Sequence, residues 1–154
     1  MNNSIKLICA LMAVISSIFV LTSCSNCFKS YIFEDVTFAE SFNSYGAILL
    51  SDEKAISDMI SEYNFAALSS NAYDRLALFE RDFFENNSII IIFHREITGS
   101  SKLTVEKVEY FNNTVNVVLK RSVPSVANDQ LKDYIIIVEI PQKHQYSFAS
   151  YEVY

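Results

Sequence analysis

A run of five apolar residues at positions 89–93 restricts the fold of this chain more than any other feature. Its four isoleucines and Phe93 are β-branched or aromatic, which favours a β-strand. The run shows no alternation of apolar and polar positions, so both faces of such a strand need to be covered. We therefore expect residues 89–93 to form the central strand of a sheet that is buried on both faces.

The rest of the pattern predicts further strands that are joined by recognisable turns. Strands are expected over residues 34–42, 45–50, 103–111, 114–123, 134–140 and 145–153. Turns over 43–46 and at Asn112-Asn113 predict two hairpins, while Pro124 and Pro141 end the strands that precede them.

Two helices are expected between the early strands and the central one. Ser51 is placed to cap a helix over 52–63, whose apolar residues recur at helical spacing. A second, short helix is expected over 73–84, after a loop over 64–72. The predicted fold class is therefore α+β, a mostly antiparallel sheet of about six to seven strands with one main helix and a second short helix packed on it.

The first 23 residues contain the parts of a bacterial signal peptide in order. Lys6 gives a positive start, an apolar run covers residues 7–20, and Leu21-Thr22-Ser23-Cys24 resembles a bacterial lipobox. In such signals the cysteine becomes the first residue of the mature protein and carries acyl chains. The alternative is an uncleaved membrane helix, since an apolar stretch of roughly 17–25 residues can span a bilayer.

Cleavage before Cys24 would divide the chain into a signal peptide (1–23), a tether (24–33) and a single domain (34–154). Membrane lipid would then hold the domain at the extracytoplasmic face of a bacterial membrane, because two or three acyl chains give durable anchoring. Cys27 would be the one cysteine left, so no intrachain disulfide is expected. Cys27 is either an idle thiol in the tether, a site for an intermolecular bridge or a second acylation site.

Charge and composition exclude several classes of site. The chain has 12 Lys and Arg against 18 Asp and Glu, which predicts no contact with nucleic acid. Its two glycines, Gly46 and Gly99, are too few for a glycine-rich phosphate loop, and His94 and His144 are too few for a zinc site of three histidines. We therefore expect neither a cofactor nor a metal.

The second half of the chain resembles the PrcB-type protease-complex subunit family, chiefly its C-terminal domain. The resemblance rests on the strand at 89–93, the turn at Thr98-Gly99, the hairpin around Asn112-Asn113, Pro124, and the strand that ends at Pro141. The strand and helix over 47–63 and the stretch over 81–84 look like the upstream region of that family. The resemblance implies a PrcB-like domain in a small exported lipoprotein, acting as an extracytoplasmic interaction module.

Few side chains form patterns that could carry chemistry, and no catalytic residue is assigned. His94 and Glu96 would project from the same face of a strand, which suits a general base with an orienting carboxylate, or a strand end that emerges into solvent. An acidic group would either bind calcium or form a solvated helical face. This group contains Asp74, Glu80, Asp82 and Glu85.

Aromatic residues near the C-terminus and in the hairpin could supply a platform for a peptide or a sugar, or belong to a half-buried edge strand. They are Tyr110, Phe111, Tyr146, Phe148, Tyr151 and Tyr154.

Two functions remain. The first is a membrane-anchored protein-interaction module, an accessory or regulatory subunit of an envelope protease, which contacts its partner through a sheet edge or loops. The candidate loops are the turn at Thr98, Gly99 and Ser100 and residues 125–131. The second is a small hydrolase or ligand-binding enzyme that uses His94 and Glu96. Because the sequence carries no catalytic signature, we favour the first function, with a protein partner.

Overall fold

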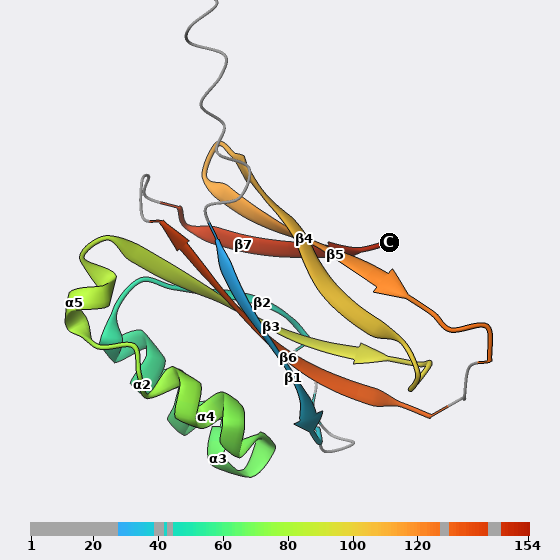
Figure 1. The fold of residues 1–154 in the computed structure, drawn as a ribbon. Helices are drawn as coiled ribbons and strands as arrows, with labels where there is room; N and C mark the ends of the chain where they lie inside the picture. The colour runs from blue at the N-terminus through green and yellow to red at the C-terminus, as the bar shows by residue number, and fades with distance from the viewer. Residues whose placement is uncertain (1–27, 39–41, 43–44, 127–129, 142–145) are drawn as a thin grey trace, which may run out of the picture.

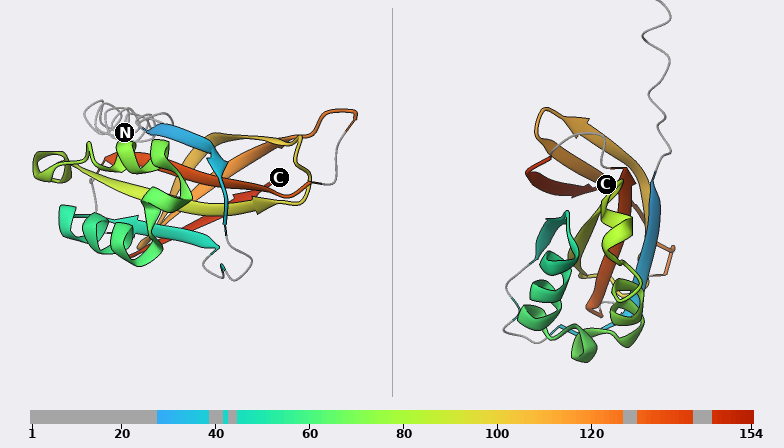
Figure 2. Two further views of the ribbon diagram at one scale, coloured as in Figure 1. Left: turned by 90° about the horizontal axis from the view of Figure 1, so that it is seen from below. Right: turned by 90° about the vertical axis from the view of Figure 1, so that its left-hand side faces the viewer.

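The structure is a computed structural model, and it describes residues 28–38, 42, 45–126, 130–141 and 146–154. Within these residues, seven strands and four helices form three layers: helices, a four-stranded sheet and a three-stranded sheet (Figures 1 and 2). The predicted α+β class is confirmed, but the single sheet is corrected to two sheets. The predicted signal peptide, Cys24 and Cys27 lie outside the described residues.

The central layer, sheet A, has the strand order β1-β6-β3-β2, and all neighbouring strands are antiparallel. Its strands are β1 (Lys29–Val36), β2 (Gly46–Leu50), β3 (Asn87–Glu96) and β6 (Lys132–Pro141). The interior position predicted for residues 89–93 is confirmed, because β3 pairs with β6 on one side and β2 on the other.

Both faces of β3 are buried, as its uninterrupted apolar run predicts. Ile89, Ile91 and Phe93 pack on the helical side, and Ile90 and Ile92 pack against the second sheet. All five side chains are fully buried. Alternate residues of one strand therefore belong to two separate apolar cores.

The second sheet, sheet B, has the order β4-β5-β7. Strands β4 (Lys102–Phe111) and β5 (Thr114–Ser122) form the predicted hairpin, and Asn112 takes a left-handed conformation with φ of 50° at the turn. The last strand, β7 (Phe148–Val153), lies parallel to β5 at the edge of this sheet.

Four short helices cover the outer face of sheet A. They are α2 (Glu53–Tyr63), α3 (Phe65–Leu68), α4 (Ser70–Leu76) and α5 (Arg81–Phe84). The cap of α2 is Asp52 and not the predicted Ser51, because the Asp52 carboxylate accepts a hydrogen bond from the Ala55 amide at 2.7 Å.

The predicted loop over 64–72 is wrong, and the helix predicted over 73–84 is confirmed only in part, since α4 ends at Leu76 and α5 covers Arg81–Phe84. Ser69 caps α4 by accepting a hydrogen bond from the Ala72 amide, so the helix begins earlier than expected. Phe65 and Ala72 are fully buried against sheet A. Burial of these residues stabilises short helical turns in a segment whose small and polar composition is typical of a loop.

The predicted first hairpin is also wrong. The first strand begins at Lys29, within the predicted tether, and ends at Val36. It pairs with β6, whereas β2 pairs with β3. Strands β6 and β3 therefore lie between β1 and β2, which follow each other in the sequence. The predicted turn residues 43 and 44 are outside the described part of the chain.

Sheet A has two distinct ends. At the end called proximal here, Lys29 pairs with Glu139 and Asn87 pairs with Pro141. At the opposite, distal end, Glu96 pairs with Lys132. A strand of ten residues, such as β3, separates the two ends by about 30 Å.

A partly buried ion pair joins the strands at the distal end of sheet A. Arg95 and Asp133 lie opposite each other on β3 and β6, and the guanidinium donates two hydrogen bonds to the carboxylate, of 2.6 and 2.9 Å. The same carboxylate accepts a hydrogen bond from the Phe38 amide at 2.7 Å. Hydrogen bonding to Asp133 raises the pKa of Arg95 above its ordinary value. The pair therefore joins three segments of chain.

Removing this carboxylate should destabilise the protein strongly. We expect Asp133→Ala to lower the free energy of unfolding by about 3 kcal/mol, because Arg95 and the Phe38 amide would lose their buried partner. Urea denaturation measures the change. The matched control is Asp58→Ala, which removes the exposed pair with Lys54 on α2 and should cost far less, because solvent screens that pair. Equal losses in the two variants would contradict the prediction.

Candidate functional site

Two loops meet at the distal end of the molecule. One is the turn over 97–101 between β3 and β4, and the other connects β5 to β6. Their strands are held together, because Glu96 pairs with Lys132 and Lys102 pairs with Ser122. The predicted interaction turn and the second predicted loop are therefore neighbours, although they are more than twenty residues apart in sequence.

Four exposed apolar side chains belong to these two loops, and we call this set of residues the distal surface. Its residues and their exposed fractions are Ile97 (76%), Val123 (52%), Val126 (84%) and Leu131 (64%). Thr98, Gly99 and Ser100 themselves are only half-buried. The residue of this turn that is presented most fully to solvent is thus Ile97, which the sequence reasoning did not select.

A buried tyrosine fixes the turn from below. Tyr134 is fully buried, and its hydroxyl donates a 2.6 Å hydrogen bond to the carbonyl oxygen of Ser101. The Ser101 amide in turn donates to the carbonyl of Thr98 at 2.9 Å. The Oγ of Ser101 is buried and has no hydrogen-bond partner among the described residues. The turn that follows Ile97 is therefore held by one bond within its backbone and one from the buried Tyr134 side chain.

The predicted pair of His94 and Glu96 is confirmed as a contact. His94 Nε2 lies 2.9 Å from Glu96 Oε1, and His94 Nδ1 lies 3.1 Å from the Tyr151 hydroxyl. Arg121 donates from Nε to the same Glu96 oxygen at 2.9 Å. Side-chain exposure is 12% for His94 and 2% for Glu96. The pair is thus enclosed between the sheets and does not emerge into solvent.

This cluster joins the two sheets. His94 and Glu96 come from β3 in sheet A, whereas Arg121 and Tyr151 come from β5 and β7 in sheet B. Burial, followed by the charge of Glu96, raises the pKa of Tyr151. A raised pKa disfavours the tyrosinate that a nucleophile would need. The geometry therefore indicates a buried polar contact between layers more than a catalytic site.

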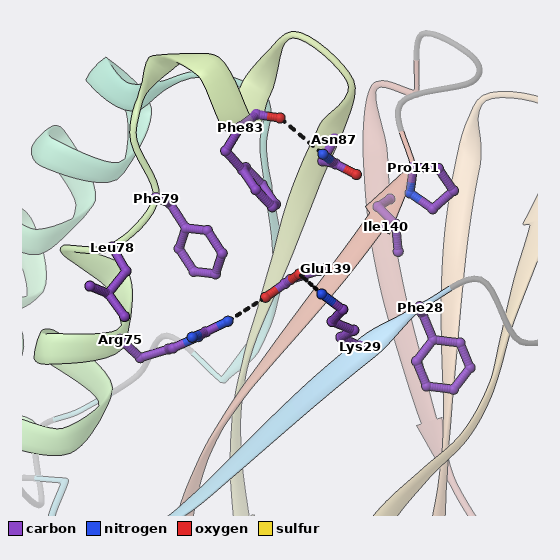
Figure 3. A pocket seen from close by; sticks show the side chains of 10 residues that line it. All are labelled: Phe28, Lys29, Arg75, Leu78, Phe79, Phe83, Asn87, Glu139, Ile140 and Pro141. Atoms are coloured by element: carbon purple, nitrogen blue, oxygen red, sulfur yellow. Dashed lines mark hydrogen bonds and ion pairs between the residues drawn. The ribbon is translucent and has the colours of Figure 1, made fainter.

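A hollow lies at the proximal end, between the helices and the start of β1 (Figure 3). It has a volume of about 600 Å³ and combines apolar side chains, among them Phe79 and Pro141, with a charge pair. Arg75 donates to Glu139 at 2.5 Å and to the Tyr31 hydroxyl, and its guanidinium carbon lies 3.7 Å from the centre of the Tyr31 ring. The charge of Arg75 is thus already neutralised.

Sequence reasoning missed this hollow, because Arg75 on α4 and Glu139 on β6, which form its hydrogen-bonded ion pair, are 64 positions apart. Residues so far apart form no recognisable sequence motif. The pairing of β1 with β6, which was not predicted, brings Tyr31 to the same place.

The six candidate aromatic residues do not form one platform. Tyr110 and Tyr146 stack with ring centres 5.3 Å apart, and Tyr151 contacts His94. Phe111 and Phe148 are exposed at the hairpin end of sheet B, whereas Tyr154 lies beside the far end of β5.

Further features bear on the expected class of protein. In the described residues, no group of three or more His, Cys, Asp or Glu side chains could hold a metal ion. The helices of the described residues do not include one long and apolar enough to cross a membrane. Comparisons with protein-family models, curated proteins and solved structures find no match.

The support beneath the turn gives a paired test. We expect Tyr134→Phe to lower the free energy of unfolding by about 1–2 kcal/mol, since the Ser101 carbonyl would lose its buried donor. Ser101→Ala should leave stability unchanged or raise it by about 0.5 kcal/mol, because the hydroxyl it removes is buried without a partner. Urea denaturation measures both. A loss in Ser101→Ala as large as that in Tyr134→Phe would refute the assignment.

The contact between the sheets predicts a dependence on alkaline pH. The raised pKa means that folded protein holds the Tyr151 proton more tightly than unfolded chain does. This group should therefore leave stability unchanged below about pH 10 and lower it as the pH rises through the raised pKa. We expect Tyr151→Phe to show a shallower decline in unfolding free energy between about pH 10 and 11 than the parent chain. Parallel declines would show that Tyr151 is not involved.

Proposed function

We propose that this protein is a lipid-anchored, extracytoplasmic interaction module that acts as an accessory or regulatory subunit of an envelope protease. The ordered signal-peptide pattern that ends at Cys24 supports the anchor. The resemblance to the PrcB-type family supports the class of partner. Cys24 would bind membrane lipid through its acyl chains, and the domain would bind protein.

The distal surface is the observation that carries this proposal. Exposed apolar side chains on neighbouring loops support a protein-binding role for this end of the molecule. Here the four residues stand on loops whose flanking strands are paired, and Tyr134 fixes one of the loops from within. The turn over 97–101 is held by hydrogen bonds before it meets a partner, so it loses little conformational entropy on binding.

The position of this surface fits an anchored protein. The first described residues, Phe28 and Lys29, lie at the proximal end of sheet A. The distal surface lies about 30 Å away, at the other end of β3. With the anchor at the proximal end, the distal surface would point away from the membrane and stay accessible to a protein partner.

The alternative function, a small hydrolase or ligand-binding enzyme, would use His94 and Glu96. One contact favours it, because Glu96, His94 and Tyr151 form a continuous chain of hydrogen bonds. Both ring nitrogens of His94 are occupied in this chain, and Glu96 is also bound by Arg121. A substrate proton would have to displace one of these partners, so the geometry supports the interaction module better.

Site-specific crosslinking in intact cells tests the proposal. With benzoylphenylalanine at position 97 or 131, we expect one discrete adduct, which mass spectrometry identifies as a component of an envelope protease. The control is position 106, where Glu106 is exposed on β4 away from both loops. Adducts of equal yield from position 106, or none from the two loop positions, would contradict the proposed surface.

Intact-mass analysis of the protein from its own cells tests the anchor separately. We expect a chain that begins at Cys24 and carries the mass of acyl chains. A chain that retains Met1 and lacks acyl mass would overturn the anchor.

A further inference from the structure

A row of three side chains, two of them phenylalanines, crosses sheet B at its hairpin end, and we call it the aromatic row. Thr114 pairs with Phe111 on one side and with Phe148 on the other, so the three side chains share one face of the sheet. Phe111 is 59% exposed and Phe148 is 64% exposed. The neighbouring positions, Val115 and Ala149, point to the opposite face, into the core between the sheets. The two phenylalanines therefore stand on the outer face.

The next row of the same face is polar. Glu109 pairs with Asn116, which pairs with Ser150, and the Ser150 hydroxyl donates to the Asn116 side chain at 3.0 Å. Lys107 lies 2.5 Å from Glu109 as an exposed ion pair. The apolar side chains on this face are thus limited to the terminal row of Phe111 and Phe148, and the adjacent row is already polar.

This row lies at the proximal end of the molecule. Strand β6 ends at Pro141 at that end, and β7 begins only seven residues later, at Phe148. In Figure 1 the start of β1, the turn between β4 and β5, and the start of β7 lie toward the same, upper part of the molecule, and β1 also contacts β4. The aromatic row is therefore near the point at which the chain enters the domain.

The length of chain before β1 sets how far this end can stand from a membrane. Four residue steps separate Cys24 from Phe28, and fully extended chain covers at most about 14 Å over that length. A headgroup layer is about 5–7 Å thick on each side of a bilayer. If Cys24 is acylated, the proximal end has to lie at or close to the headgroups.

We propose that Phe111 and Phe148 dock the domain onto the bilayer that holds the acyl chains, with both rings at the boundary between headgroups and hydrocarbon. This inference rests on the lipid anchor of the proposed function and adds a second, non-covalent contact to it. Phenylalanine is one of the residues that interfacial segments bury at the boundary between headgroups and acyl chains. The polar row of Glu109, Asn116 and Ser150 would stay in the headgroup layer and limit the depth of insertion.

The chain contains no tryptophan, so a single introduced indole reports on one position. We would reconstitute full-length, acylated Phe111→Trp and Phe148→Trp proteins in phosphatidylcholine vesicles that contain brominated lipid. The matched control is Ile97→Trp, an exposed apolar position at the distal end. We expect brominated lipid to quench the indole at 111 and 148 at least about twofold more than the indole at 97, and iodide in the water to do the reverse.

The outcomes separate this inference from the proposed function. Acylated protein with equal quenching at all three positions would overturn the docking and leave the anchor intact. Protein without acyl mass would overturn the anchor and the docking together. An indole at 111 or 148 that is shielded from iodide but not quenched by brominated lipid would indicate a second copy of the chain on this face, and would also overturn docking on lipid.

Discussion

The need to cover both faces of β3 and β6 determines the architecture. Neither strand has a polar face between its ends, so sheet A requires one apolar layer on each side. The chain supplies helices on one side and sheet B on the other, which divides the interior into two cores. Every other element is placed by this requirement. The short helices are stabilised by burial more than by their own propensity, since three of the four contain seven residues or fewer.

Polar pairs at the distal end define how β3 and β6 align. Along the isoleucine-rich stretch, sliding one strand past the other by two residues would again place apolar groups on apolar groups. The pair of Arg95 and Asp133 removes this ambiguity, because its two hydrogen bonds form in one alignment only. His94 and Glu96 act similarly between the sheets through Tyr151 and Arg121. The few buried polar groups thus select one arrangement, while the apolar groups supply most of the stabilisation.

The sequence predicted those strands and turns whose formation depends on neighbouring residues. The apolar run predicted β3, the proline at 141 marked the end of β6, and Asn112-Asn113 predicted the only hairpin that the sequence placed correctly. Partners that are distant in sequence could not be predicted. The pairing of β1 with β6 depends on contacts about 100 residues apart, and the Tyr151 partner of His94 is 57 residues away. The interaction turn was predicted at Thr98, Gly99 and Ser100, but the most exposed residue of the turn is Ile97, and the Tyr134 hydroxyl that binds Ser101 comes from a strand distant in sequence.

The isoleucine-rich strands also have a consequence for folding. Residues 89–93 and 135–138 are uncharged and contain no proline, and each is the kind of segment that forms intermolecular β-structure when it is exposed. In the native protein both are fully shielded, but neither is shielded until the helices and sheet B have assembled around them. Refolding yield should therefore fall as protein concentration rises, because these segments can pair with those of other molecules before they are covered.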